Sequence, residues 1–381
     1  MTHPNIGAAG SAPTSTCLIA GALAASCLIA AARPALGQAA GGAQELAPLT
    51  ITAPAPSPVH PNAADARLQI ERTPGAVEVV EAEEFIESRA ITIKDMLDYT
   101  PGVFAQPKFG EDSRLSIRGS GLSRNFHLRG VKLLQDGVLP INTADGGGDF
   151  QEIDPLALSY VEVYKGANAL RYGASSLGGA INFVTPTGRD LPRAFARAGY
   201  GSFDTYRLQL GSGGVHGDWD YAISGAYLAS KGFRDHSAQD SRRLSTNLGY
   251  RFGDGAETRF YLNLNDIDQE LPGSVSKRQA LTYPKAATAS AIAGDQAREI
   301  DSVRVANKTA FFIGDVETTV GAFYFDRRLD HPIFQVLDNH YRDYGGFLRG
   351  AGEFDLAGHG NRFVLGANLH AGDTDARRFV N

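Results

Sequence analysis

Residues 161–185 read VEVYKGANALRYGASSLGGAINFVT. Two short runs with the composition of β-strands, residues 160–164 and 180–184, flank a segment rich in small residues. The segment contains Gly166, Gly173, Gly178 and Gly179, with Arg171 and Tyr172 set among them. Glycine accepts positive φ angles and lets two backbone segments approach closely. The stretch therefore predicts two strands joined by a tightly packed turn region, with an ordinary glycine-rich hairpin of a soluble β domain as the alternative.

The residues before this stretch, from position 71 onward, have the pattern of a small α/β domain. Thr92-Ile93-Lys94-Asp95 is a capping-box pattern that starts a helix, and Pro101-Gly102 would end that helix. Asp136-Gly137 is the strongest short hairpin signal in the chain. The predicted strands are residues 76–80, 115–118, 126–129 and the two arms of a hairpin over 131–139.

Four short motifs in this interval resemble the plug domain of TonB-dependent outer-membrane receptors. They are TPGV at 100–103, IRG at 117–119, LLQDGV at 133–138 and the opening stretch with its RYG…GGAINFVT. The last motif is seldom met outside that family. The resemblance covers residues 71–185 and implies a plug domain that sits inside a transmembrane β-barrel.

Residues 1–37 predict a signal peptide. An apolar run over 17–32 is followed by Ala35-Leu36-Gly37, a small-x-small cleavage pattern, although no Lys or Arg precedes the run. Both cysteines of the chain, Cys17 and Cys27, lie in this run. The mature protein would therefore contain no thiol and no cysteine-ligated metal.

Residues 38–70 are rich in Ala, Pro and Gly and predict a flexible linker. Within the linker is a β-prone island formed by Leu49, Thr50, Ile51, Thr52 and Ala53. A short extended segment on a tether can add as a strand to the sheet edge of a partner. Its place ahead of a plug-like domain resembles the TonB box, which implies the energy-transducing protein TonB as a partner. A chance apolar patch in a linker is the alternative.

From position 194 to 381 the chain alternates apolar and polar residues in segments typical of transmembrane β-barrel strands. The nine predicted strands are residues 194–200, 205–213, 218–230, 242–252, 257–268, 302–313, 317–330, 341–355 and 362–372. Short connections alternate with long ones, as expected when one barrel end faces the periplasm and the other the outside. The short connections are 215–217, 253–256 and 314–315, and the long ones are 231–241, 269–301 and 331–340.

The expected fold is an α+β plug domain followed by a transmembrane antiparallel β-barrel that is incomplete. Plugged outer-membrane barrels have about 22 strands, and nine strands are neither even in number nor enough to enclose a plug. Residues 377–381 do not have the pattern of a closing amphipathic strand. We therefore expect the N-terminal part of a receptor, from a truncated reading frame or a split gene.

Composition and motif searches argue against other classes. The chain has 36 Lys and Arg against 42 Asp and Glu, a net charge of −6, so it has no basic excess for nucleic acid. No apolar run reaches the ~18 residues that a membrane helix needs. Dinucleotide loops, nucleophile elbows, EF-hands and HExxH pairs are not matched. We expect no catalytic residue, no cofactor and no resident metal, and the protein is not predicted to be an enzyme.

The resemblance also implies residues that hold the plug in the barrel. Arg118 and Arg171 stand at positions that in the family lock plug to barrel through paired glutamates. Those glutamates would lie in barrel strands beyond the present ones. Arginine suits this role because its planar fork holds carboxylates bidentately even when buried. Arg129 is a rival for the role of Arg118, and ordinary solvated arginines are the alternative.

The sequence signals for ligand-binding residues are weaker than those for the plug domain. Basic residues outnumber acidic ones in residues 104–129 and 231–243, which favours an anionic ligand at the outer mouth. The candidate ligand-binding residues are Arg124, Asn142, Asp145 and Gln151. The segment LPGSVSKRQA at 271–280 resembles a barrel loop in receptors of the ferric dicitrate type.

Together these features predict a TonB-dependent receptor for a ferric chelate in the outer membrane of a Gram-negative bacterium. Its expected partners are TonB, outer-membrane lipid and a small-molecule metal chelate. Three alternatives stay open: a receptor remnant or docking surface without transport, a receptor for haem, cobalamin or another metal chelate, and a passive porin. The plug and the TonB-box-like segment oppose the porin.

Overall fold

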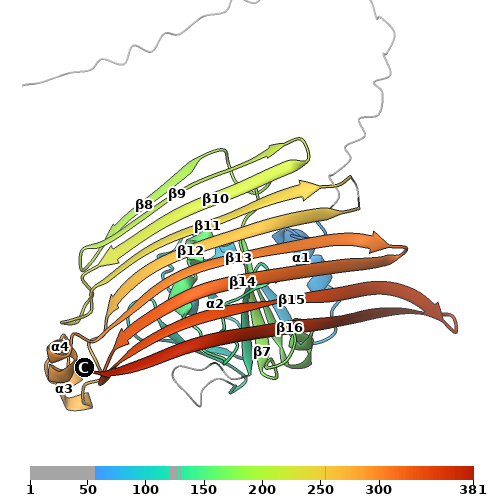
Figure 1. Cartoon of the computed structure of the whole chain (residues 1–381). Helices are drawn as coiled ribbons and strands as arrows, with labels where there is room; N and C mark the ends of the chain where they lie inside the picture. The colour runs from blue at the N-terminus through green and yellow to red at the C-terminus, as the bar shows by residue number, and fades with distance from the viewer. Residues whose placement is uncertain (1–55, 121–127, 129, 254) are drawn as a thin grey trace, which may run out of the picture. The chain divides into compact units, whose positions relative to one another are not determined.

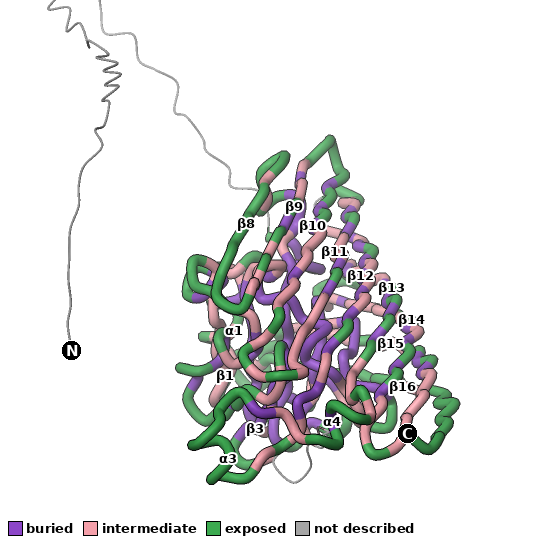
Figure 2. The backbone as a smooth tube through the Cα atoms, turned by 90° about the vertical axis from the view of Figure 1, so that its left-hand side faces the viewer, coloured by how far each residue is buried: buried purple, intermediate pink, exposed green. Residues whose placement is uncertain are grey.

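The computed structural model describes residues 56–120, 128, 130–253 and 255–381. No described helix is both long and apolar enough to cross a membrane. Two bodies of β structure organise the described residues: a small sheet system built by residues before 185, and a nine-stranded antiparallel sheet built by residues after 194 (Figure 1). The large sheet curves around one side of the small one (Figures 1 and 2).

The first body is an α+β domain. Its main sheet has the strand order β1-β6-β7-β4-β5, in which β4 and β7 are parallel and the other neighbours antiparallel. A separate pair, β2 and β3, lies beside it. The strands are β1 (Val77–Glu81), β2 (Val103–Pro107), β3 (Ser113–Ile117), β4 (Val131–Gln135), β5 (Leu139–Pro140), β6 (Tyr160–Lys165) and β7 (Gly179–Val184). The helices are α1 (Ala63–Glu71) and α2 (Ile93–Leu97), with short 3-10 turns η1 (Ala82–Glu84), η2 (Phe150–Glu152), η3 (Pro155–Ala157) and η4 (Gly166–Tyr172).

The strands predicted at 160–164 and 180–184 are present as β6 and β7, and they pair antiparallel. Every residue of both strands is buried. Close approach explains the glycine pair between them. A Cβ on Gly178 would lie 2.3 Å from the Ser120 Cβ, and a Cβ on Gly179 would lie 2.5 Å from the Tyr164 carbonyl oxygen. Only glycine fits at these two positions.

Two other local predictions for this domain are confirmed. The capping box forms, since Asp95 accepts from the backbone N–H of Thr92 at 2.9 Å and α2 begins at the next residue. The hairpin of β4 and β5 turns at Asp136 and Gly137, whose φ angles are 55° and 69°. Positive φ at both central residues is the geometry of a type I′ turn.

A compact apolar core holds the domain together. Leu97, Leu133, Val161 and Phe183 are fully buried, and they come from α2, β4, β6 and β7. Burying such a side chain contributes about 1.5–3 kcal/mol. The core therefore joins the helix to the centre of the sheet, and the loops before and after η2 lie at its margin.

The second body is a meander in which every strand pairs with its neighbours in sequence. Its strands are β8 (Phe195–Gly201), β9 (Thr205–His216), β10 (Trp219–Ser230), β11 (Gln239–Arg251), β12 (Glu257–Glu270), β13 (Ala297–Ile313), β14 (Val316–Pro332), β15 (Gln335–Leu356) and β16 (His359–Val380). Two short helices, α3 (Lys277–Thr282) and α4 (Ala289–Ala293), lie between β12 and β13. The nine predicted barrel strands are thus observed. Within the described residues β8 and β16 do not pair with each other, so this barrel wall is open.

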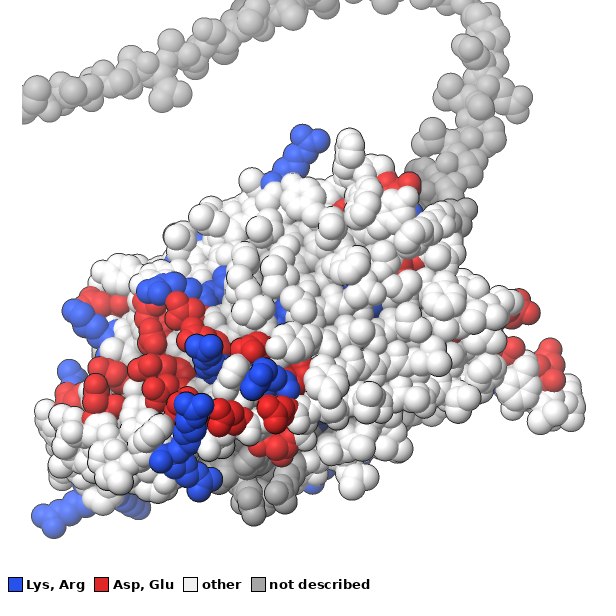
Figure 3. Space-filling model, viewed as in Figure 1, with Lys and Arg blue, Asp and Glu red and all other residues white. Residues whose placement is uncertain are grey.

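The wall has the two faces expected of a barrel. Alternate residues of β12 are buried, and those between them are half-buried or exposed. Exposed apolar side chains such as Ile223, Leu248, Phe260 and Val305 cover the outer face. Charged side chains on that face gather at the end where α3 and α4 lie, while the middle of the face carries few (Figure 3). An uncharged belt with a charged rim is the pattern of a lipid-facing wall.

Two predictions about the wall are wrong. Residues 331–340 are not a long loop, because β14 continues to Pro332 and β15 begins at Gln335. The last predicted strand, 362–372, ends too early, because β16 continues to Val380 and pairs with β15. Both errors concern strand ends. The backbone ladder continues beyond the apolar belt, where polar side chains reach water and do not interrupt pairing.

Candidate functional site

Within the described residues, five arginines of the wall form ion pairs with carboxylates of the α+β domain, and we call them the wall arginines. They occupy positions in phase with the buried residues of their strands, so their side chains lie between the two bodies. They are Arg207 on β9, Arg243 on β11, Arg298 and Arg304 on β13, and Arg327 on β14. Alternation along each strand explains why they point inward.

The partners of the wall arginines are four buried carboxylates of the α+β domain, which we call the plug carboxylates. They come from two segments, one before β3 and one around η2 and η3, and they are Glu111, Asp149, Glu152 and Asp154, with Asp112 as a fifth, more distant partner 3.7 Å from Arg298. Each is at most 6% exposed, so it is largely desolvated. A buried carboxylate needs a charged or hydrogen-bonding partner, which explains why each is paired.

The first two pairs tie the domain to β9 and β11. Arg243 donates to Glu111 at 2.6 Å and to the Gln151 carbonyl oxygen at 2.8 Å. Ser241 also donates to Glu111, at 2.6 Å. Arg207 donates to Asp154 at 2.5 Å. These contacts join residues more than fifty positions apart and fix the domain against the wall.

The remaining pairs lie on β13 and β14. Glu152 accepts from Ser302 at 2.6 Å and forms an ion pair with Arg304. Asp149 forms ion pairs with Arg327 and, at 2.6 Å, with Arg298. Burial acts to raise the pKa of Asp149, but the guanidinium groups of Arg327 and Arg298 outweigh burial and hold its pKa below the usual value of 3.8. Asp149 is therefore an anion throughout the physiological range.

The guanidinium groups have more donors than these pairs use. Within the described residues, no hydrogen-bond partner is found for Arg298 Nε, Arg304 Nη1, or Arg327 Nε and Nη1. A guanidinium offers five N–H donors. The wall therefore retains buried hydrogen-bonding capacity directed at the interface.

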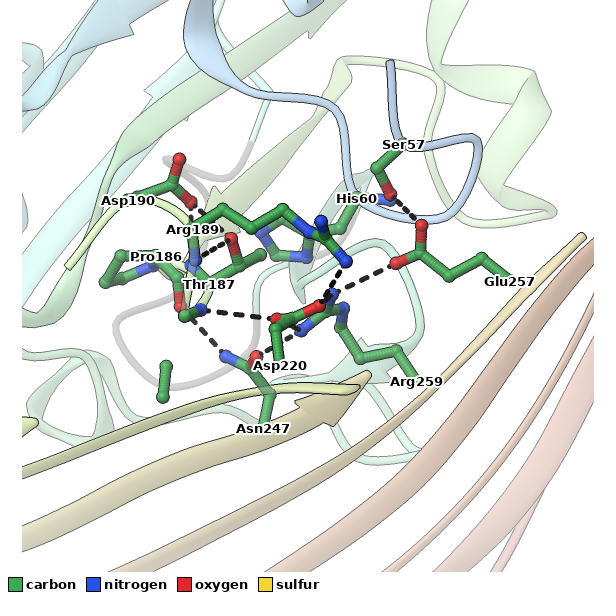
Figure 4. A network of polar contacts seen from close by, with 12 residues as sticks. Ser57, His60, Pro186, Thr187, Arg189, Asp190, Asp220, Asn247, Glu257 and Arg259 are labelled. Atoms are coloured by element: carbon green, nitrogen blue, oxygen red, sulfur yellow. Dashed lines mark hydrogen bonds and ion pairs between the residues drawn. The ribbon is translucent and has the colours of Figure 1, made fainter. Parts of the chain in front are cut away.

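A second polar network lies near the β9–β10 and β11–β12 turns, at the other end of the wall (Figure 4). Arg259 forms a bidentate pair with Asp220 at 2.8 Å for both contacts, and a further pair with Glu257 at 3.0 Å. Asn247 accepts from Arg259 at 2.6 Å. Asp220 also pairs with Arg189 at 3.0 Å, and Asn247 donates to the Pro186 carbonyl oxygen at 2.9 Å. The network therefore joins the wall to the segment between β7 and β8.

Residues 57–60, in the C-terminal half of the predicted linker at 38–70, attach to this network. Ser57 donates to Glu257 at 2.8 Å. His60 Nε2 lies 2.6 Å from the Thr185 carbonyl oxygen, which can only accept, so Nε2 carries the proton. Nδ1 is then free to accept from the Tyr261 hydroxyl, 3.2 Å away. Burial, with the nearby charges of Arg259 and Lys308, holds the pKa of His60 well below 6.5.

The arginines predicted to hold the plug lie elsewhere. Arg118 is exposed and forms no ion pair with another described residue. Arg171 packs over the rings of Tyr164 and Tyr172, at 5.3 Å and 5.5 Å from their centroids. Its carbonyl oxygen accepts from Arg349 on β15 at 3.1 Å. Neither arginine forms an ion pair with a wall glutamate within the described strands, although Glu317 on β14 is one of the charges that raise the pKa of Arg171. Their roles stay predictions.

The candidate ligand residues are only partly accessible. Asn142 is buried and accepts from the Leu133 N–H at 2.6 Å, and Gln151 is buried and donates to Gln269 at 2.9 Å. Asp145 is exposed and accepts from the Gly147 N–H at 3.0 Å. Several predicted features lie outside the described residues. They are Arg124, Arg129, the predicted strand at 126–129 apart from residue 128, and the island formed by Leu49, Thr50, Ile51, Thr52 and Ala53.

Sequence reasoning missed the wall arginines because it placed the arginines on the plug and the carboxylates on the wall. The structure has the opposite polarity over the described strands. The signal was present in the alternation of the strands. Arg243, for example, is two residues from Ser241, and both are buried. A charged residue in phase with an inward row needs a buried partner.

A folded domain held by ion pairs against the inner face of a curved antiparallel wall defines the class of plugged β-barrels. The model of the TonB-dependent receptor plug domain matches residues 69–180. The chain is 28% identical over 207 residues to the vitamin B12 transporter BtuB of Vibrio vulnificus, covering 52% of the chain and 31% of that protein. It is 33% identical over 140 residues to the ferrichrome outer membrane transporter/phage receptor of Escherichia coli, covering 34% and 17%.

Solved structures agree on the fold. The unliganded ferric citrate transporter FecA superposes with a TM-score of 0.70 at 18% identity, covering 83% of this chain and 50% of that one. BauA, the ferric preacinetobactin receptor of Acinetobacter baumannii, gives a TM-score of 0.64 at 18% identity, covering 81% and 48%. The chain therefore spans half or less of the length of these proteins.

The chain carries a TonB-dependent receptor plug domain at residues 69–180, followed by a wall with the fold of the first part of the barrels of such receptors. It is an outer-membrane protein of the Gram-negative type, and the relatives named are transporters and receptors. The family model begins at residue 69 and ends at 180. The boundaries at 37, 70, 185 and 194 stay predictions.

Proposed function

We propose that the receptor containing this chain imports a ferric chelate across the outer membrane, with energy supplied by TonB through Leu49, Thr50, Ile51, Thr52 and Ala53. The interface carries the proposal. A plug held by several buried ion pairs does not leave its wall spontaneously, since breaking one buried pair by removing a partner costs about 3–5 kcal/mol. Import past such a plug requires work, and a β-prone segment on a tether is suited to transmit it.

The position of the tether supports this mechanism. The island ends at residue 53, and Ser57 is already bound to the wall at Glu257. Force applied to the island would act first on the contacts of Ser57 and His60, and then on α1. A strand added to the sheet edge of TonB would carry that force through backbone hydrogen bonds.

The test is uptake of radiolabelled ferric citrate by cells that express a closed-barrel receptor containing this chain. Proline cannot donate a strand hydrogen bond. Ile51→Pro is therefore expected to abolish uptake while ligand binding to the cell surface persists, and Ile51→Val serves as the matched control. Normal uptake by the Ile51→Pro variant would show that residues 49–53 are not a TonB box.

A parallel assay with radiolabelled cyanocobalamin separates the two ligand classes to which the relatives point. BtuB is named as a vitamin B12 transporter, and FecA is named as a ferric citrate transporter. The loop at 271–280, whose sequence resembles a barrel loop in receptors of the ferric dicitrate type, favours the ferric chelate. Uptake of cyanocobalamin without uptake of ferric citrate would overturn the ligand class and leave the transport mechanism intact.

A further inference from the structure

One wall strand carries a column of cations. On β13, Arg298, Arg304 and Lys308 share the inward face. Ten residues separate the first from the last, and a strand rises about 3.3 Å per residue, so the column extends about 33 Å. On the outward face of the same segment, Glu299 is exposed at one end and Val305 at the other. The column therefore runs from the charged rim of the wall into its apolar belt.

The neighbouring strand widens the column. Arg327 on β14 lies opposite Ser302 in the register of β13 and β14, one inward step from Arg304. The Arg327 guanidinium also lies 5.1 Å from the centroid of the Tyr341 ring on β15. The three arginines are buried between wall and plug, with side chains at most 13% exposed.

The plug meets this column with anions and a carbonyl oxygen. Asp149 faces Arg298 and Arg327, Glu152 faces Arg304, and the Asp136 carbonyl oxygen accepts from Lys308 at 2.7 Å. When the plug moves, it takes these acceptors with it. The cations stay on the wall without their partners, and their charge is then available to an anion in the lumen.

We propose that this column, made of Arg298, Arg304, Lys308 and Arg327, is a conduction track for an anionic cargo. The plug carboxylates occupy the track at rest, and the carboxylate oxygens of the cargo replace them during import. The buried donors of Arg298, Arg304 and Arg327 that no described residue uses provide additional hydrogen bonds for the cargo. The inference rests on the proposed transport function and deepens it, since it assigns a net negative charge to the cargo.

The experiment measures ion selectivity, which does not depend on knowing the cargo. A closed-barrel receptor containing this chain is placed in a planar bilayer, and urea unseats the plug. The reversal potential is then read across a tenfold KCl gradient. We expect the wild-type channel to prefer chloride over potassium. The double variant Arg304→Gln/Arg327→Gln should lower the chloride-to-potassium permeability ratio severalfold.

Two controls separate charge from folding and position. Arg304→Lys/Arg327→Lys keeps both charges and should keep the preference for chloride. Arg328→Gln removes a charge from the outward face of the same strand and should leave the ratio unchanged. A wild-type channel that prefers potassium, or a Gln double variant with an unchanged ratio, would overturn the track.

Failure of the conduction track can be distinguished from failure of the transport proposal. Ile51→Pro should leave the permeability ratio at the wild-type value. If that variant still imports ferric citrate, the energy-coupling proposal fails and the track stands. If it does not import ferric citrate but the Gln double variant has unchanged selectivity, the track fails and the transport proposal stands.

Discussion

His60 is the residue at which a proton has the clearest consequence. Its Nδ1 atom accepts from Tyr261, and Arg259 and Lys308 are close enough to oppose a positive charge on the ring. Asp136 lies 4.0 Å from the same nitrogen, and burial raises the pKa of Asp136 to about 6, so this carboxyl group loses its charge as the pH falls below 6. The imidazole of His60 is therefore neutral when the segment that carries it is docked.

The pH dependence follows from the sign of the shift. His60 has a lowered pKa when docked and an ordinary pKa of 6.5 when released, so the released state binds the proton more readily. Docking is fully stable above pH 6.5 and weakens below it. Between pH 7.5 and 5.5, hydrogen-exchange protection of residues 56–62, corrected for intrinsic rates, should fall about tenfold. His60→Gln should abolish this dependence, and an equal fall in that variant would contradict the explanation.

Asp149 is the carboxylate shared by two wall arginines. Asp149→Asn leaves Arg327 buried without its anion and leaves Arg298 with only Asp112, 3.7 Å away. Such a change costs about 3–5 kcal/mol. We expect exchange of residues 149–157 to accelerate at least a hundredfold, because one factor of ten corresponds to about 1.4 kcal/mol. Asp145→Asn is the matched control, since Asp145 is an exposed residue of the preceding loop, and exchange should change little. Equal effects in the two variants would show that the pairing does not seat the plug.

At the scale of elements, the glycine pair before β7 decides whether β6 and β7 can pack. In Gly179→Ala, the new Cβ would lie 2.5 Å from the Tyr164 carbonyl oxygen and 2.7 Å from Ile117 Cδ1. Overpacking of this kind typically costs about 1–3 kcal/mol. Gly148→Ala is the control in the same domain, because its nearest contact would be an ordinary 3.5 Å. Limited proteolysis of the membrane-embedded chain should cleave the plug faster in Gly179→Ala only.

The elements also show what the sequence could predict. Signals that act within a few residues were reliable, as at Asp136-Gly137 and at Thr92 with Asp95. The ends of strands were not predicted reliably. Residues 331–340 continue the ladder because they pair with partners on another strand, and the local sequence does not indicate that pairing. The plug–wall contacts were missed for the same reason. Glu152 and Arg304 are distant in sequence, and only the register of the wall brings them together.

At the scale of the whole molecule, the wall is an open sheet. Nine strands run from β8 to β16 within the described residues, and these two edge strands do not pair with each other. An unpaired backbone group in hydrocarbon costs several kcal/mol. The edge strand β16 spans 22 residues, so its free edge alone carries a large penalty in lipid. The plug contacts described above cannot satisfy these backbone groups, because they are made by side chains on the inner face.

Residues 1–381 expressed alone are therefore expected not to form a closed, heat-resistant barrel in an outer membrane. Barrel diameter grows with strand number, and lumens that hold a plug occur with about 22 strands. The measurement is gel mobility with and without heating, combined with protease treatment of membranes. We expect a single mobility and rapid degradation of the wall. As a control, the same chain joined to the barrel strands of FecA that the structural match leaves uncovered should give a heat-modifiable, protease-resistant band. A sharp heat-modifiable band from residues 1–381 alone, at monomer size, would mean that β8 and β16 find partners that the described sheet does not contain.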